Sequence, residues 1–139
     1  CTETCAKKRG WKPWLRYVDM VEVAGNPEMP PLLVNKALEK LFEKTGIQPE
    51  EIAAYECNEA FAVIDELFAR KYPSCVSAYN ACGGALAYGH PYGATGGILT
   101  LHLAKRLQQC VKNDVYGVSA IAAAGGQGTA ILWKKVCGE

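Results

Sequence analysis

Residues 83–97, GGALAYGHPYGATGG, place one of the chain's two histidines in a glycine-rich loop. Gly89 allows a sharp turn before His90, and Pro91 keeps His90 out of helical geometry. An imidazole held in this way can act as a general acid or base, because its ordinary pKa of about 6.5 makes both protonation states accessible near neutral pH. A capped or surface histidine is the alternative interpretation. The other histidine, His102, falls among leucines and is interpreted as a packed core residue.

Two other stretches carry residues suited to the same kind of site. CNEAF (57–61) puts Asn58 and Glu59 where an expected strand changes to a helix, so Asn58 is either a helix N-cap or a site residue. AIAAAGGQG (120–128) consists mostly of small residues. Such residues leave backbone N–H groups open to a developing negative charge, as in an oxyanion hole, or simply let two strands turn closely. The glycine loop lacks the lysine and hydroxyl of a phosphate-binding P-loop, which disfavours nucleotide binding.

Alternating strands and helices are expected to position these stretches. Runs of β-branched, aromatic and other apolar residues predict five strands, at 14–23, 52–57, 76–80, 116–123 and 129–136. Helical spacing predicts four helices: one from Thr2 to Gly10, one between Pro31 and Gly46, one over 58–72 and one over 98–110. The order β-α-β-α-β-loop-α-β-β predicts an α/β fold with a mixed five-stranded sheet and helices on both faces. Ligands of such sheets collect at the carboxyl ends of strands, which nominates the turns after Cys57, Tyr79 and Ala122.

Composition narrows the class of protein. The 139 residues suit one domain, half of them are apolar, and the formal net charge of +1 comes without a basic stripe. These features favour a small neutral ligand or another protein as partner, and not nucleic acid. No apolar run reaches the roughly 18 residues of a membrane span, and the amino end does not look like a secretory signal, so a cytoplasmic location is predicted. Seven scattered cysteines predict small buried thiols and neither disulfides nor a metal site.

Three stretches taken together resemble a known family in their order and spacing: CNEAFA (57–62), NACGGALAYGHPYGATGG (80–97) and AIAAAGGQGTAIL (120–132). They are similar to the carboxyl-terminal half of the thiolases, acyl-CoA C-acyltransferases that make or cleave 3-ketoacyl-CoA. The resemblance implies coenzyme A as a substrate, no tightly bound cofactor, and a dimer or tetramer. It also implies a partner outside this chain, the amino-terminal half with its nucleophilic cysteine. Residues 1–13 would then be a connecting helix and 14–139 the carboxyl-terminal domain.

The resemblance also implies roles for individual residues. Asn58 corresponds to the asparagine that orients a water toward the thioester oxygen. His90 corresponds to the histidine that helps to activate the nucleophile and, with that water, stabilises the enolate oxygen. Ala60 and Phe61 would line the pantetheine and acyl channel. The backbone N–H of Ala124 would contribute to the second oxyanion hole.

One position departs from the family in a way that bears on catalysis. Ala122 stands where thiolases have a second cysteine, the acid and base for the α-proton, and alanine carries no proton. The change is either engineered to stall the reaction or belongs to a natural relative with lost or altered chemistry. The turn PEMPP (27–31) is also unusual. The leading hypothesis is the carboxyl-terminal half of a thiolase, inactive as an isolated chain; the alternative is a non-catalytic module that binds acyl-CoA or a partner subunit. A related condensing enzyme is disfavoured, because that type tends to have histidine in place of Asn58.

Overall fold

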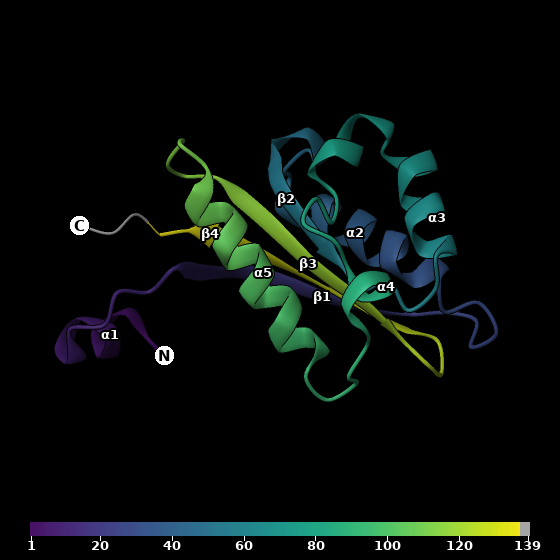
Figure 1. Ribbon diagram of the computed structural model, residues 1–139, viewed down its shortest axis with the longest axis horizontal. Coiled ribbons are helices and arrows are strands. Elements are labelled where there is room, and N and C mark those ends of the chain that lie inside the picture. Colours follow the sequence, from purple (N-terminus) through teal and green to yellow (C-terminus); the bar gives the residue numbers. More distant parts are fainter. Residues whose placement is uncertain (137–139) are drawn as a thin grey trace.

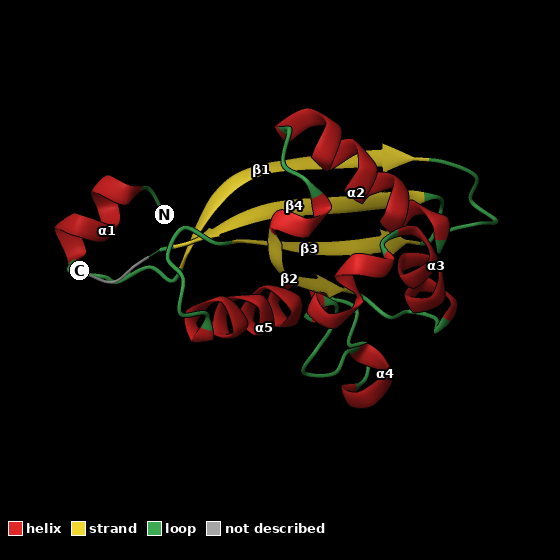
Figure 2. Ribbon diagram, turned by 90° about the horizontal axis from the view of Figure 1, so that it is seen from above, coloured by secondary structure: helices red, strands yellow, loops and turns green. Residues whose placement is uncertain are grey.

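The computed structural model describes residues 1–136 (Figure 1). Its helices and strands follow the chain in this order: α1 Glu3–Arg9, β1 Leu15–Ala24, α2 Leu32–Thr45, η1 Pro49–Glu51, β2 Ile52–Cys57, α3 Val63–Lys71, η2 Pro73–Ala78, α4 Ala85–Tyr88, α5 Thr95–Gln109, β3 Tyr116–Ala123 and β4 Gln127–Lys135. The elements η1 and η2 are 3₁₀ helices. Both figures of the whole chain place α1 at one end of the molecule and α3 at the other (Figures 1 and 2).

The strands form one mixed sheet in the order β1-β4-β3-β2. The pair β2 and β3 is parallel, whereas β4 runs antiparallel to both β1 and β3. The predicted mixed α/β sheet and the closing hairpin are therefore confirmed. Within residues 1–136 the sheet has four strands, and the prediction of five is wrong.

The segment 76–80 is the strand that does not form. Residues 73–78 make the 3₁₀ helix η2, and only Tyr79 forms an isolated parallel bridge, to Tyr55. The next residue explains the result. The side chain of Asn80 accepts a hydrogen bond from Cys57 N and donates one to Cys57 O, both at 2.9 Å. A further strand would have paired with these backbone groups of Cys57. The Asn80 side chain therefore takes the place of a strand-to-strand hydrogen-bond ladder.

Helices cover both faces of the sheet, as predicted. The buried apolar residues of the described part of the chain form two clusters. Val118 and Ala120 of β3 point into the larger one, to which α2 and α3 also contribute side chains. Gly117 points to the opposite face, where a Cβ would lie 2.7 Å from the Leu103 side chain of α5. This alternation is the period of two that a strand imposes on its side chains. Helices α2 and α3 therefore lie on one face of the sheet, and α5 lies on the other.

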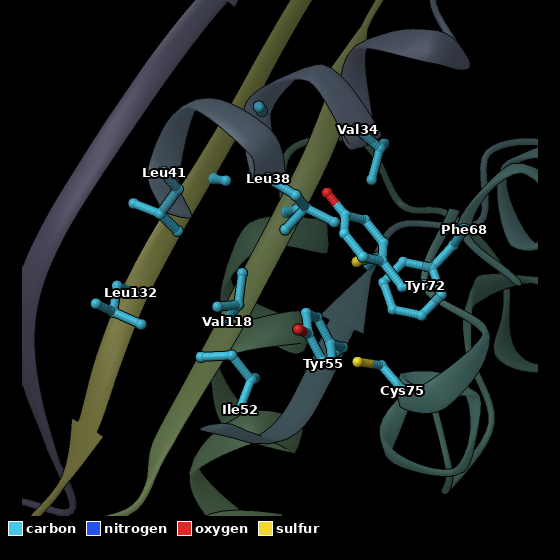
Figure 3. Packing of buried hydrophobic residues seen from close by; sticks show 14 of the residues in the cluster. Val34, Leu38, Leu41, Ile52, Tyr55, Phe68, Tyr72, Cys75, Val118 and Leu132 are labelled. Atoms are coloured by element: carbon cyan, nitrogen blue, oxygen red, sulfur yellow. The ribbon is translucent and has the colours of Figure 1, made fainter. Parts of the chain in front are cut away.

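The larger core holds the carboxyl end of β2 against α3 (Figure 3). The ring of Phe68 lies 5.0 Å from that of Tyr55, 5.3 Å from Tyr72 and 4.2 Å from Tyr79. Such tilted aromatic contacts stabilise a pair by about 0.5–1.5 kcal/mol beyond simple burial. The apolar positions predicted for α2 are buried or nearly so, and the fully buried ones are Val34, Ala37, Leu38 and Leu41.

Local patterns predicted both ends of α1 correctly but misplaced the starts of α3 and α5. Thr2 caps α1 by accepting a hydrogen bond from Cys5 N at 3.2 Å, and Gly10 ends it with φ 65°, both as predicted. The third predicted helix starts late, at Val63 and not at residue 58, and α5 starts early, at Thr95 and not at residue 98. No helix among the described residues is long and apolar enough to cross a membrane.

Candidate active site

Asn58 lies at the point where β2 leaves the sheet. Its backbone N–H donates to Ala120 O at 2.9 Å and thereby extends the parallel pairing of β2 with β3 by one residue. The side chain is fully buried, and Oδ1 accepts no hydrogen bond from the described residues. Asn58 does not cap α3, whose N-cap is Ala62. A buried amide oxygen without a partner is costly in a stable fold, which favours a functional role for Asn58.

His90 follows the short helix α4, which Gly89 ends with φ 95°. Few residues other than glycine adopt this backbone conformation, so Gly89 permits the turn that brings His90 inward. The Nε2 atom of His90 lies 3.2 Å from Asn58 Nδ2, and Nδ1 lies 2.7 Å from Thr95 Oγ1. Both ring nitrogens of His90 are therefore held by side chains of the protein, which excludes a free surface imidazole but fits a capped histidine as well as a catalytic one.

The hydrogen bonds of Thr95 favour a proton on Nδ1 of His90. The hydroxyl of Thr95 donates to Pro91 O at 3.1 Å, so its oxygen is left to accept from His90 Nδ1–H. Nε2 is then unprotonated in the neutral ring and accepts from the Asn58 amide. This tautomer follows from the network and presents the basic atom of His90 to Asn58.

The other predicted site residues fall into two environments. Ala60 and Ala122 are partly buried and pack against the larger core. Phe61 is 58% exposed, and Ala124 is exposed in the turn between β3 and β4. The structure therefore joins Asn58 directly to His90 and leaves Phe61 and Ala124 open to a ligand or a partner.

A buried ion pair supports β2, the strand that ends just before Asn58. Glu56 is fully buried, and its Oε1 accepts from Arg106 Nη1 at 2.6 Å. Arg106 also donates to Tyr55 O at 2.9 Å and to Ala78 O at 2.7 Å, which ties α5 to β2 and η2. Burial raises the pKa of the Glu56 carboxyl, although Arg106 opposes that effect. His102 Nδ1 lies 4.0 Å from Glu56 Oε2, so His102 packs beside this pair.

Sequence reasoning missed Thr95 and Asn80, which position the two candidate groups. Thr95 is almost fully buried and orients His90, and Asn80 holds the backbone of Cys57 beside Asn58. A threonine in the first turn after a histidine-proline pair was the available signal for Thr95. Within residues 1–136 no group of three or more His, Cys, Asp or Glu side chains could hold a metal ion.

The cysteine next to Asn58 is not suited to be a nucleophile. Cys57 is completely buried, and burial together with the nearby Glu56, Asp65 and Glu59 raises its pKa well above the ordinary value. We expect a thiol-alkylating reagent to modify exposed Cys82 at least about 100-fold faster than Cys57 in the folded chain. Mass spectrometry of peptides after timed quenching measures both rates.

Unfolding provides the control for this labelling experiment. In strong denaturant Cys57 and Cys82 should react at similar rates, because the difference comes from burial and charge in the fold. Equal rates in the folded chain would contradict the buried position of Cys57. Cys137 lies outside the described residues.

Comparisons with known proteins relate this chain to one protein family. Residues 11–135 match the family described as "Thiolase, C-terminal domain". A putative acetyl-CoA C-acetyltransferase of Bacillus subtilis, YhfS, is 37% identical over 135 residues, which cover 95% of this chain and 36% of that protein.

Solved structures agree with the sequence comparison. The chain resembles the Acat5 thiolase of Ascaris suum in complex with coenzyme A, with a TM-score of 0.88, 31% identity, and coverage of 97% of this chain and 34% of that one. It also resembles the peroxisomal 3-ketoacyl-CoA thiolase of Saccharomyces cerevisiae, with a TM-score of 0.86, 30% identity, and coverage of 96% and 38%. The yeast enzyme is described as a five-layered structure built from two core domains of identical topology. The chain thus spans about a third of the length of these relatives.

Proposed function

Because the chain belongs to the thiolase family as its carboxyl-terminal domain, we propose that it supplies Asn58 and His90 to acyl transfer to and from coenzyme A. The observation that supports this most directly is the 3.2 Å contact between Asn58 Nδ2 and His90 Nε2. The two residues come from separate loops, are 32 positions apart in the chain, and meet beside the end of a parallel strand pair. Acyl-CoA is the substrate class that the named relatives support.

In this proposal His90 moves a proton during formation of the acyl-enzyme. Its unprotonated Nε2 accepts the proton of the nucleophilic cysteine thiol, which belongs to the amino-terminal half of a thiolase. The resulting thiolate attacks the acyl carbonyl, and coenzyme A leaves as a thiolate that takes up a proton from the solvent, so Nε2 keeps the proton it received. The protonated Nε2 can then donate a hydrogen bond to the thioester oxygen of the second acyl-CoA as negative charge develops there.

Asn58 and the neighbouring loops complete the proposed site. The buried Oδ1 of Asn58 can accept from a water that donates to the same thioester oxygen. Ala60 and Phe61 would line the channel for pantetheine and acyl group, and the exposure of Phe61 supports this assignment. The N–H of Ala124 would serve the second oxyanion hole. Fixed donors of this kind contribute roughly 3–4 kcal/mol each to transition-state stabilisation.

An amino-terminal thiolase half is the proposed partner. Leu101 of α5 is 49% exposed, and a shallow hollow beside α5 is lined by Leu99, Ile121 and Ile131 among others. A second core domain, as in the yeast relative, would cover this apolar surface and bring the nucleophilic cysteine to His90. We assign residues 1–13 to the connection between the halves. "Complete enzyme" below means this chain joined to an amino-terminal half that carries that cysteine.

Ala122 supports a second candidate function. A site without the acid and base for the α-proton cannot exchange that proton at an enzymatic rate. The domain would then be a thiolase-like module that binds acyl-CoA or a partner subunit without turnover. Binding would still use Phe61 and the turn at Ala124.

The purified chain alone is expected to show no thiolysis of acetoacetyl-CoA in the presence of coenzyme A. Position 122 holds alanine where thiolases have their second cysteine. Cys57 is buried, and its pKa is raised. The measurement is the loss of acetoacetyl-CoA absorbance, with a known thiolase as positive control. Turnover by the chain alone would contradict the assignment of the nucleophile to another half.

A further inference from the structure

Glu59 connects the turn that carries Asn58 to the loop that carries His90. One carboxylate oxygen, Oε1, accepts a hydrogen bond from Asn80 Nδ2 at 2.9 Å. The other, Oε2, accepts from the backbone N–H of Leu86 at 2.9 Å. Leu86 belongs to α4, the short helix that ends immediately before His90. Both oxygens of one side chain are therefore used, on two different segments of chain.

The fit around the carboxylate is close. A Cβ built on Gly84 would lie 2.3 Å from the carboxyl carbon of Glu59 and 2.4 Å from each of its oxygens. Real side chains do not approach so closely, so only glycine at position 84 allows the carboxylate to reach Leu86 N. Gly84 thus serves at least partly to admit Glu59.

Asn80 extends this connection to the sheet. Its side chain holds both backbone groups of Cys57 and also donates to Glu59. Asn80 has φ 40°, a backbone conformation that asparagine tolerates better than most residues. Asn80 is buried, so its two hydrogen bonds to Cys57 are made away from water. One continuous chain of hydrogen bonds therefore runs from the end of β2 through Asn80 and Glu59 to α4.

We propose that Glu59 is a positioning residue: its carboxylate holds α4, and with it the loop of His90, in the place where Nε2 meets Asn58. The effect on catalysis rests on the proposed function, whereas the effect on the geometry of His90 does not. Glu59 touches no reacting atom. It acts through the backbone of Leu86, and its loss should change the environment of His90 more than the stability of the core.

The direct test is the variant Glu59→Gln in the full chain. A glutamine amide offers one acceptor and one donor group, so either Asn80 Nδ2 or Leu86 N–H must lose its acceptor. We expect amide hydrogen exchange at Leu86 to become about tenfold faster, the change that follows from loss of a hydrogen bond to a charged group. Exchange at Phe68, in the core, should stay unchanged.

Nitrogen NMR of the His90 ring provides the readout that a merely structural role would not alter. At about pH 8, above the ordinary histidine pKa, the native chain should show the Nδ1–H tautomer. In Glu59→Gln the ring should shift toward the Nε2–H tautomer that predominates in free histidine. The matched control is Glu66→Gln, because among residues 1–136 the Glu66 carboxylate pairs with exposed Arg70 on α3 and not with the loop of His90. It should leave His90 and Leu86 unchanged.

A second variant keeps the proposal testable if Glu59→Gln does not fold. Gly84→Ala leaves Glu59 in place but forces its carboxylate away from Leu86, and should produce the same change at His90. An unchanged His90 tautomer in whichever of the two variants folds would overturn the proposal.

Kinetics of the complete enzyme separate this proposal from the proposed function. With Ala122→Cys as the background, Glu59→Gln should lower kcat about tenfold or more and leave the KM for coenzyme A nearly unchanged. An unchanged kcat would overturn the catalytic part of the proposal. If that background has no turnover at all, the proposed function fails, and the NMR result alone decides whether Glu59 positions His90.

Discussion

The complete enzyme with Ala122→Cys should catalyse thiolysis of acetoacetyl-CoA at least about 100-fold faster than the complete enzyme with Ala122, because general acid–base catalysis typically contributes a factor of 10² to 10⁴. Ala122 lies on β3 two positions after Ala120, whose carbonyl accepts the backbone N–H of Asn58. The partner of Ala122 across the hairpin is Gly128, which itself has no side chain. A thiol there has an ordinary pKa of about 8.5 and can both remove and return a proton near neutral pH. Steady-state rates with both enzymes measure the effect.

Ala123→Cys is the matched control for this gain of activity. It adds the same thiol one residue further along β3, and neighbouring side chains of a strand point to opposite faces. Its rate should stay within about twofold of that of the Ala122 enzyme. Equal rates for the two cysteine variants would reject acid–base catalysis at position 122 and favour the non-catalytic module.

His90→Ala, introduced into the enzyme with Ala122→Cys, should lower kcat by about 10² to 10⁴. The substitution removes the Nε2 atom that accepts from Asn58 and, in the proposed mechanism, takes the proton of the nucleophile. The first half-reaction should slow by a similar factor, because proton removal from the nucleophile precedes the attack. Rapid-mixing measurements of acyl-enzyme formation, followed by mass spectrometry of the trapped protein, separate this step from the later ones.

The second histidine supplies the control for that substitution. His102→Asn removes an imidazole of α5 that lies beside Glu56 and against the Tyr88 ring of α4, and that forms no hydrogen bond with Asn58 or His90. Its kcat should remain within about threefold of the parent enzyme, although its stability can fall through changed packing. A kcat for His90→Ala above a tenth of the parent value would contradict the role proposed for His90.

Much of the fold follows from patterns that are local in the sequence. The apolar spacing of Val34, Leu38 and Leu41 predicts α2, and the predicted bounds 52–57 and 116–123 match β2 and β3. Caps such as Thr2 and Gly10 act within one helical turn, so their effect can be read from neighbouring residues. Local periodicity is informative here because burial repeats with the period of the element itself.

The predictions that failed concern segments whose partners are distant in the chain. Residues 76–80 have the composition of a strand, yet Asn80 binds the backbone of Cys57 and the Tyr79 ring packs on Phe68. The helix predicted to begin at residue 58 begins at Val63, because Asn58 N is still paired with Ala120 O. No pattern within these short segments reveals such partners.

For the site, the residue types and their positions nominated Asn58 and His90, whereas the anomaly at Ala122 came only from the resemblance to the thiolases. Three motifs in a fixed order and spacing carry that information. Only the tertiary structure decided that Asn58 and His90 meet, that Thr95 contacts the other ring nitrogen of His90, and that Glu59 joins their two loops. Hydrogen bonds act over about 3 Å and between residues tens of positions apart, so their partners are determined by the folded backbone and not by local sequence.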